Sequence, residues 1–312
     1  MKLLTLAVVA LLASGAAARD LSVVSADPVA VAAHPANVVA FVMPSHGDGM
    51  NAVLYTAAGE GAHPTLLLFH GFPGNEQNLD LAQAVRRAGW NVLTLHYRGS
   101  WGSKGDFSFA HALEDAQVAL DWLRDPANAE KNGIDIKRIV VGGHSMGGFM
   151  AAKVAAASVT PVKVVAPKKG EAAKPVVKPA PALRGLLLID AWNIGSSANK
   201  FGGEGRAKAL ADFAENMPPL AGTSPEALVD EAVAHARDWN LIGDAKALAK
   251  LPLLDIGAAR GIGADNQALA AAVAGQPGSR VMATTMPTDH SFSDHRIALI
   301  EGVVGWLQDL PK

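Results

Sequence analysis

The feature that most constrains the fold is an alternation of short apolar runs with segments of helical period along most of the 312 residues. Runs such as 65–70 and 91–97 are continuous and mostly apolar, which is typical of parallel strands buried on both faces of a sheet. The segment 78–89 between them has apolar residues at helical spacing, which predicts a helix. Strands that alternate with helices favour a doubly wound, mostly parallel α/β sheet.

The same patterns give a full set of expected elements. We expect strands over 37–43, 50–56, 65–70, 91–97, 138–143, 183–190, 251–257 and 280–286. We expect the main helices over 78–89, 109–125, 146–157, 267–275 and 294–310. The first two strands should form an antiparallel pair around the turn Gly47-Asp48-Gly49.

Two segments interrupt the alternation of strands and helices. Residues 159–182 are rich in Pro, Lys, Ala and Val without a helical period, which predicts a flexible surface insertion. Residues 191–250 carry helical pieces between two strands and are too long for an ordinary connection. We expect them to form a helical lid over the carboxyl edge of the sheet, within one domain spanning 19–312.

The composition excludes several kinds of site and partner. The chain has no cysteine, which excludes a disulfide framework, a thiolate nucleophile and a zinc site built on cysteines. The formal net charge is only −2, so neither nucleic acid nor an anionic membrane surface is an expected partner.

The N-terminus resembles a secretory signal peptide. Lys2 is followed by the apolar run 3–12, and Ala16 and Ala18 form a small-x-small cleavage pattern. We expect cleavage near Ala18, a signal segment over 1–18, and a secreted or periplasmic protein. No later stretch reaches about 18 uninterrupted apolar residues, so we expect no stable membrane insertion.

The string Gly143-His144-Ser145-Met146-Gly147 fits G-x-S-x-G and lies between an expected strand and an expected helix. This is the context of a nucleophile elbow, in which a strained turn presents a serine hydroxyl. The turn is so tight that a side chain at Gly143 or Gly147 should clash. We therefore predict Ser145 to be a catalytic nucleophile.

A second glycine-rich string, 70–74 (HGFPG), directly follows the expected strand 65–70. Acyl transfer builds an oxyanion that needs two preorganised donors. We expect one to be the backbone N–H of Met146 and the other that of Phe72, in the loop after the earlier strand.

A serine nucleophile needs a base, which in this arrangement follows it in the chain. Only His235, His290 and His295 follow Ser145. His290 comes just past the last expected strand and before the closing helix, where a base at the sheet edge should lie. We therefore predict His290 to be the base.

The carboxylate that orients the base should lie between Ser145 and His290 in the chain, in the loop after the strand 251–257. Asp265 fits this place, although Asp is also common as a helix N-cap. Asp255, within the strand itself, is its main rival, and Asp289 is adjacent to the histidine. We predict Asp265 to be the acid.

His70 and His144 also lie close to these motifs. We expect structural roles for them, His70 bonding the loop backbone and His144 packing beside the elbow, because neither fits the chain order. We expect neither a cofactor nor a metal ion, since the chain has no metalloprotease, P-loop or dinucleotide motif.

These motifs resemble those of the α/β-hydrolase superfamily, over a stretch from about Val38 to Leu310. The strings HGFPGNEQN, GHSMGG and TDHSF look like the prolyl-oligopeptidase-type, dienelactone-hydrolase-like catalytic domain. Peptidases of that type carry a large N-terminal propeller, whereas only some twenty residues separate the expected signal from the first strand here.

The resemblance implies a serine hydrolase that acts on ester or small amide bonds of small molecules through a Ser-His-Asp acyl-enzyme mechanism. A peptidase of the prolyl-oligopeptidase type is one alternative. A non-catalytic, ligand-binding relative is another, because a fold alone does not imply an activity.

Overall fold

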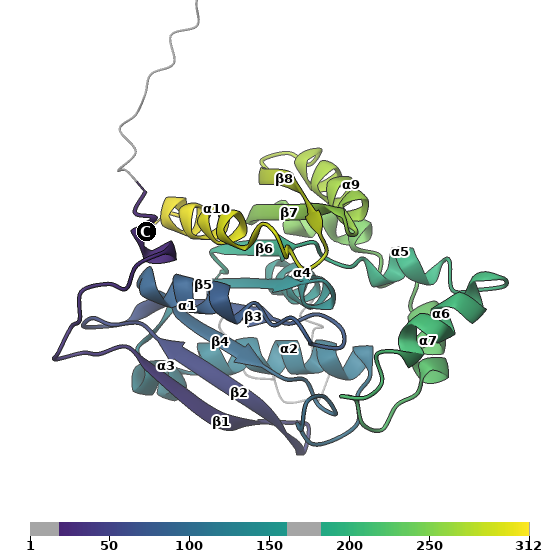
Figure 1. Cartoon of the computed structure of the whole chain (residues 1–312), viewed down its shortest axis with the longest axis horizontal. Helices are drawn as coiled ribbons and strands as arrows, with labels where there is room; N and C mark the ends of the chain where they lie inside the picture. The colour runs from purple at the N-terminus through teal and green to yellow at the C-terminus, as the bar shows by residue number, and fades with distance from the viewer. Residues whose placement is uncertain (1–18, 161–181, 312) are drawn as a thin grey trace, which may run out of the picture.

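The computed structural model describes residues 19–160 and 182–311 (Figure 1). The expected signal segment 1–18 lies outside the described residues, so export stays a prediction. Nearly all of the expected insertion 159–182 lies outside them too. Within the described ranges, no helix is both long and apolar enough to cross a bilayer.

The described strands form one eight-stranded sheet in the order β1-β2-β4-β3-β5-β6-β7-β8. Strands β1, β2 and β4 pair antiparallel, and all later pairs are parallel. The strands are β1 (Asn37–Ser45), β2 (Asp48–Thr56), β3 (His63–Phe69), β4 (Asn91–Leu95), β5 (Ile134–His144), β6 (Gly185–Ile189), β7 (Pro252–Arg260) and β8 (Arg280–Asp289).

Helices cover both faces of the sheet (Figure 1). One face packs against α1 (Leu79–Arg87) and α10 (Arg296–Asp309). The other face packs against α2 (Phe109–Arg124), α4 (Met146–Val159) and α9 (Gly263–Ala274). Strands β4 and β6 are buried at every position, which explains why apolar residues do not alternate with exposed polar ones along them.

The expected fold class is therefore confirmed, and each expected strand and main helix has a counterpart. One helix was missed, α3 (Pro126–Asn132), because it has only seven residues and no apolar period. Its ends nevertheless carry clear signals. Asp125 caps its first turn, Pro126 begins it, and Gly133 ends it at φ 60°.

Residues 191–250 form several short helices, as expected. They are α5 (Ile194–Ala198), α6 (Gly205–Ala214), α7 (Pro225–Ala234), the 3₁₀ turn η2 (Leu241–Asp244) and α8 (Ala245–Leu248). In Figure 1, α5, α6 and α7 lie beyond one end of the sheet.

This helical segment is hydrogen-bonded to the rest of the domain. The Glu231 carboxylate of α7 accepts the N–H groups of Phe109 and Ala110, at 2.8 and 3.0 Å. These are two of the free donors at the start of α2. The segment therefore caps a helix of the main scaffold.

Candidate active site

Ser145 occupies a strained turn between β5 and α4. Its φ is 55° and its ψ is −121°, a combination that a serine adopts only where its surroundings enforce it. A Cβ at Gly143 would lie 2.3 Å from the carbonyl of Gly147, and one at Gly147 would lie 2.1 Å from the carbonyl oxygen of Phe69. The expected need for both glycines is confirmed.

The glycine-rich loop after β3 touches this turn directly. A Cβ on Gly71 would lie 2.9 Å from the Cβ of Ser145, so only glycine lets the two backbones approach so closely. Phe72 follows in the loop, and Met146 begins α4, where the first N–H groups have no acceptor within the helix. The structure thus brings the segments of both expected oxyanion donors to Ser145.

His290 follows β8 and is held by a carboxylate. Its Nδ1 lies 2.6 Å from Oδ2 of Asp190, and because a carboxylate only accepts, Nδ1 donates. This fixes the tautomer and leaves Nε2 as the basic nitrogen. The His290 side chain is 38% exposed, whereas that of Asp190 is fully buried.

Asp190 directly follows β6 and is held by backbone donors as well. Its Oδ1 accepts the N–H of Ala258 at 2.8 Å, and its Oδ2 accepts that of Ile262 at 3.0 Å. A Cβ on Gly261 would lie 2.2 Å from the same Oδ2. The end of β7 and the turn after it therefore hold this carboxylate, and Gly261 leaves room for it.

The prediction that Asp265 is the carboxylate partner of His290 is therefore wrong. Asp265 lies in the first turn of α9, where its N–H bonds the carbonyl of Ile262. The N-cap position itself belongs to Ile262. The loop after β7 supplies backbone to the site, and the carboxylate comes from the neighbouring strand, β6.

The rival Asp255 is not the partner either. It is 1% exposed, and among the described residues neither carboxyl oxygen has a hydrogen-bond partner. Burial, and secondarily the nearby charge of Asp190, raise the pKa of Asp255 well above its ordinary value. Burial therefore favours the neutral, protonated form of this carboxyl group.

Asp190 was missed because it is the last residue of the expected apolar strand 183–190, not a residue of the loop where the acid is expected. It satisfies the order Ser145, acid, His290 as well as Asp265 does. A charged residue at the carboxyl end of an otherwise apolar strand was the available signal, since ligands bind at that edge of a parallel sheet.

His70 and His144 are both buried close to Ser145. The Nδ1 of His70 lies 2.7 Å from the carbonyl oxygen of Gly71, which bears out its expected bond to the loop backbone. Burial lowers the pKa of His70 to about 3 and that of His144 to about 4. Both rings are therefore neutral near pH 7.

Comparison with known proteins identifies the family. Residues 66–301, well over half of the chain, match the model of the Alpha/beta hydrolase family. The chain belongs to that family. The prolyl-oligopeptidase-type subfamily is not supported by these matches.

Individual relatives agree on the fold of this hydrolase. It is 37% identical over 91 residues to the Alpha/beta hydrolase domain-containing protein WAV2 of Arabidopsis thaliana, covering 28% of each chain. An esterase of Pyrobaculum calidifontis superposes with a TM-score of 0.63 at 19% identity, over 92% of this chain and 88% of that one. Est1E of Butyrivibrio proteoclasticus superposes with a TM-score of 0.61 at 14% identity, over 86% and 96%.

An aromatic cluster joins the glycine-rich loop after β3 to the helical segment. The ring of Phe72 lies 5.3 Å from that of Phe213 in α6 and 5.7 Å from that of Phe109 in α2. Phe213 and Trp239 are each 5% exposed, so both act as core contacts of the segment. Trp101, by contrast, is 40% exposed, and its Nε1 donates to the carbonyl of Pro73 in the same loop.

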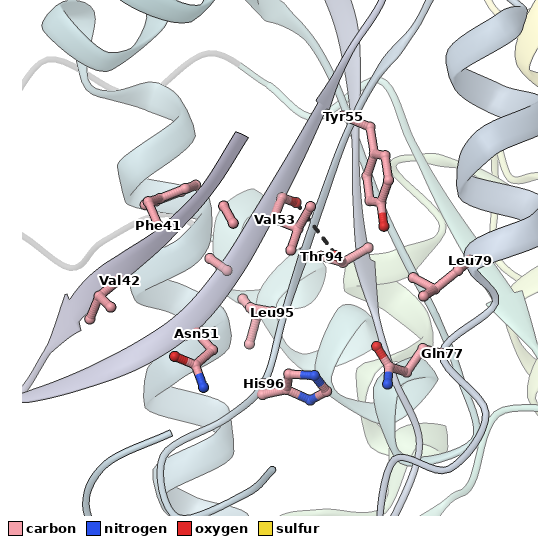
Figure 2. Close-up of a pocket in the computed structure, with 12 residues that line it drawn as sticks. Phe41, Val42, Asn51, Val53, Tyr55, Gln77, Leu79, Thr94, Leu95 and His96 are labelled. Carbon is pink, nitrogen blue, oxygen red and sulfur yellow. Dashed lines mark hydrogen bonds between the residues drawn. The ribbon is translucent and has the colours of Figure 1, made fainter. Parts of the chain in front are cut away.

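A cavity of about 400 Å³ lies elsewhere, on the face of β1, β2 and β4 that bears Val42 and Val53 (Figure 2). Its other lining residues include Leu79 and His96, both labelled in the figure. None of the predicted catalytic residues lines this cavity. It is therefore separate from the site around Ser145.

Proposed function

We propose that this Alpha/beta hydrolase is a serine hydrolase that cleaves ester or small amide bonds of small molecules. Ser145 is the nucleophile, His290 the general base and Asp190 the acid that orients it. The observation that carries the proposal is the 2.6 Å hydrogen bond from His290 to a buried carboxylate, which leaves Nε2 as the basic nitrogen.

The two-step reaction follows from these roles. His290 takes the proton of the Ser145 hydroxyl as its oxygen attacks the substrate carbonyl. The backbone N–H groups of Met146 and Phe72 hold the oxyanion of the tetrahedral intermediate. His290 then protonates the leaving group, an acyl-enzyme forms on Ser145, and water repeats the sequence to release the acid. The chemistry needs no cofactor.

Hydrogen bonds on both sides of Ser145 support its closeness to His290. The N–H of Ser145 bonds the carbonyl of Ile189, which directly precedes Asp190. On its other side, His144 bonds the carbonyl of His290 at 2.7 Å. The nucleophile is thus linked through single neighbours to both the acid and the base.

The esterase names of the structural relatives favour ester substrates over peptides. The chain spans less than a third of the length of WAV2, the curated relative described above. The substrate is therefore assigned here by chemistry, as the ester or amide of a small molecule.

A fluorophosphonate probe tests the proposal, because it reacts covalently with activated serines. We expect it to label the wild-type protein and not Ser145→Ala, and we expect p-nitrophenyl ester hydrolysis to fall by at least about 10³-fold in the same variant. Equal labelling of both proteins would remove Ser145 from the mechanism. Complete inactivity without labelling would favour a non-catalytic, ligand-binding role.

A further inference from the structure

The ring of His144 contacts both the backbone and the ring of His290, the proposed base. Its Nε2 lies 2.7 Å from the carbonyl oxygen of His290, and the centroids of the two imidazoles are 4.5 Å apart. His144 also lies beside the loop that carries the proposed oxyanion donor Phe72, since a Cβ on Gly71 would lie 3.3 Å from its Nδ1. One side chain, next to the nucleophile in sequence, therefore bonds the base and lies beside this loop.

The chemistry of these contacts fixes the state of the His144 ring. A carbonyl oxygen only accepts, so Nε2 of His144 carries the proton. A second proton would have to sit on Nδ1, which is buried and has no partner among the described residues. Burial, followed by the nearby imidazole of His290, lowers the pKa of His144 to about 4. The ring is a neutral donor that adds no charge beside the base.

The base needs such support because it lies on a turn after the last strand, and its side chain is 38% exposed. The hydrogen bond to Asp190 fixes the rotation of the His290 imidazole about its side-chain bonds. This bond does not fix the main chain of His290. The bond from His144 acts on that main chain. The two bonds together restrain both ends of the residue.

We propose that His144 is a positioning residue, which holds the main chain of His290 so that its imidazole meets the Ser145 hydroxyl. This inference rests on the proposed serine-hydrolase function. A displacement of about 1 Å in such a group can cost about 10²-fold in rate. Loss of the Nε2–H donor should therefore lower kcat more than it changes KM.

Two variants separate the hydrogen bond from simple packing. His144→Leu fills the space without a donor, whereas His144→Gln can place an amide N–H close to the position of Nε2. With p-nitrophenyl acetate we expect kcat to fall about 10- to 100-fold in the first and to stay within about 3-fold of wild type in the second. KM should change less than about 3-fold in both. His63→Leu is the matched control. His63 also bonds backbone carbonyls, but it lies at the start of β3, at the end of the strand away from the loop 70–74.

A second readout does not depend on turnover. The His290 proton shared with Asp190 should give a downfield ¹H NMR resonance, which weakens or shifts in His144→Leu and returns in His144→Gln. A wild-type protein that hydrolyses no ester would contradict the proposed function, while this resonance would still test the role of His144.

Three results would overturn the inference. One is a wild-type kcat and an unchanged resonance in His144→Leu. Another is an equal loss in both variants, which would leave packing as the only role. If His144→Leu does not fold, a loss of 10-fold or more in a folded His144→Gln, judged by circular dichroism, would equally reject it.

Discussion

Oδ2 of Asp190, at the end of β6, lies 2.6 Å from Nδ1 of His290, which follows β8. Strand β7 lies between these two strands in the sheet. The acid and the base thus meet across the end of β7, and β7 and the turn after it each supply one backbone donor to the carboxylate. Asp190 and Asp265 therefore predict different mutational outcomes.

Asp190→Asn should lower kcat for p-nitrophenyl acetate by about 10³- to 10⁴-fold, because an amide no longer holds His290 in the required tautomer. Asp265→Asn is the matched control and should stay within about 2-fold of wild type. Steady-state kinetics near pH 7.5 measure both. A large loss in Asp265→Asn with a small one in Asp190→Asn would reverse the assignment.

Gly261→Ala should also damage catalysis. The added Cβ would lie 2.2 Å from Oδ2 of Asp190 and 3.1 Å from the Cα of His290, so the pair must shift. We expect kcat to fall about 10- to 100-fold. Gly243→Ala is the control, because nothing lies within 4 Å of its Cβ position. Equal activities in the two variants would show that the carboxylate seat is not rigid.

Stability should fall as the solution is acidified from about pH 6.5 to pH 4. Burial lowers the pKa values of His70 and His144 to about 3 and about 4, so between these values and 6.5 the unfolded chain binds more protons than the folded one. Each histidine then contributes a slope of about 1.4 kcal/mol per pH unit to the free energy of unfolding.

Urea unfolding at several pH values measures that slope. It should be shallower in His144→Gln, which has no titrating group at this position. An identical pH dependence in both proteins would show that His144 is not the buried neutral group described above.

Asp255 should respond in the opposite direction. Because its pKa is raised in the folded protein, its contribution to stability decreases as pH rises above the ordinary value for Asp. Asp255→Asn should therefore gain stability relative to wild type as pH rises from 4 to 8, with kcat within about 3-fold of wild type. Thermal unfolding and ester hydrolysis at both pH values test this prediction. A large loss of kcat would instead show that Asp255 takes part in catalysis.

The fold could be predicted because local and global signals agree. Mostly apolar runs such as 65–70 form buried parallel strands, and the amphipathic segment 78–89 forms α1. Gly143 and Gly147 indicate the tight turn at Ser145 already in the sequence, because the need for glycine at these positions is local and steric.

The acid was harder to predict than the fold, because its role depends on contacts between residues that are distant in sequence. Asp190 is 100 residues from His290 in sequence, and its other partners, Ala258 and Ile262, belong to the next strand and its turn. An aspartate just before a helix, such as Asp265, looks equally suitable in the sequence. Only the relative placement of β6, β7 and β8 distinguishes the two.

The turn that follows β7 offers a consequence for protein engineering. It contacts the acid through the main-chain N–H of Ile262, and the absence of a side chain at Gly261 leaves room for the carboxylate. Arg260 beside it is exposed and bonds the carbonyl of Pro287. Library diversity can therefore be placed at position 260, at the rim of the site, while the reactive groups stay chemically intact.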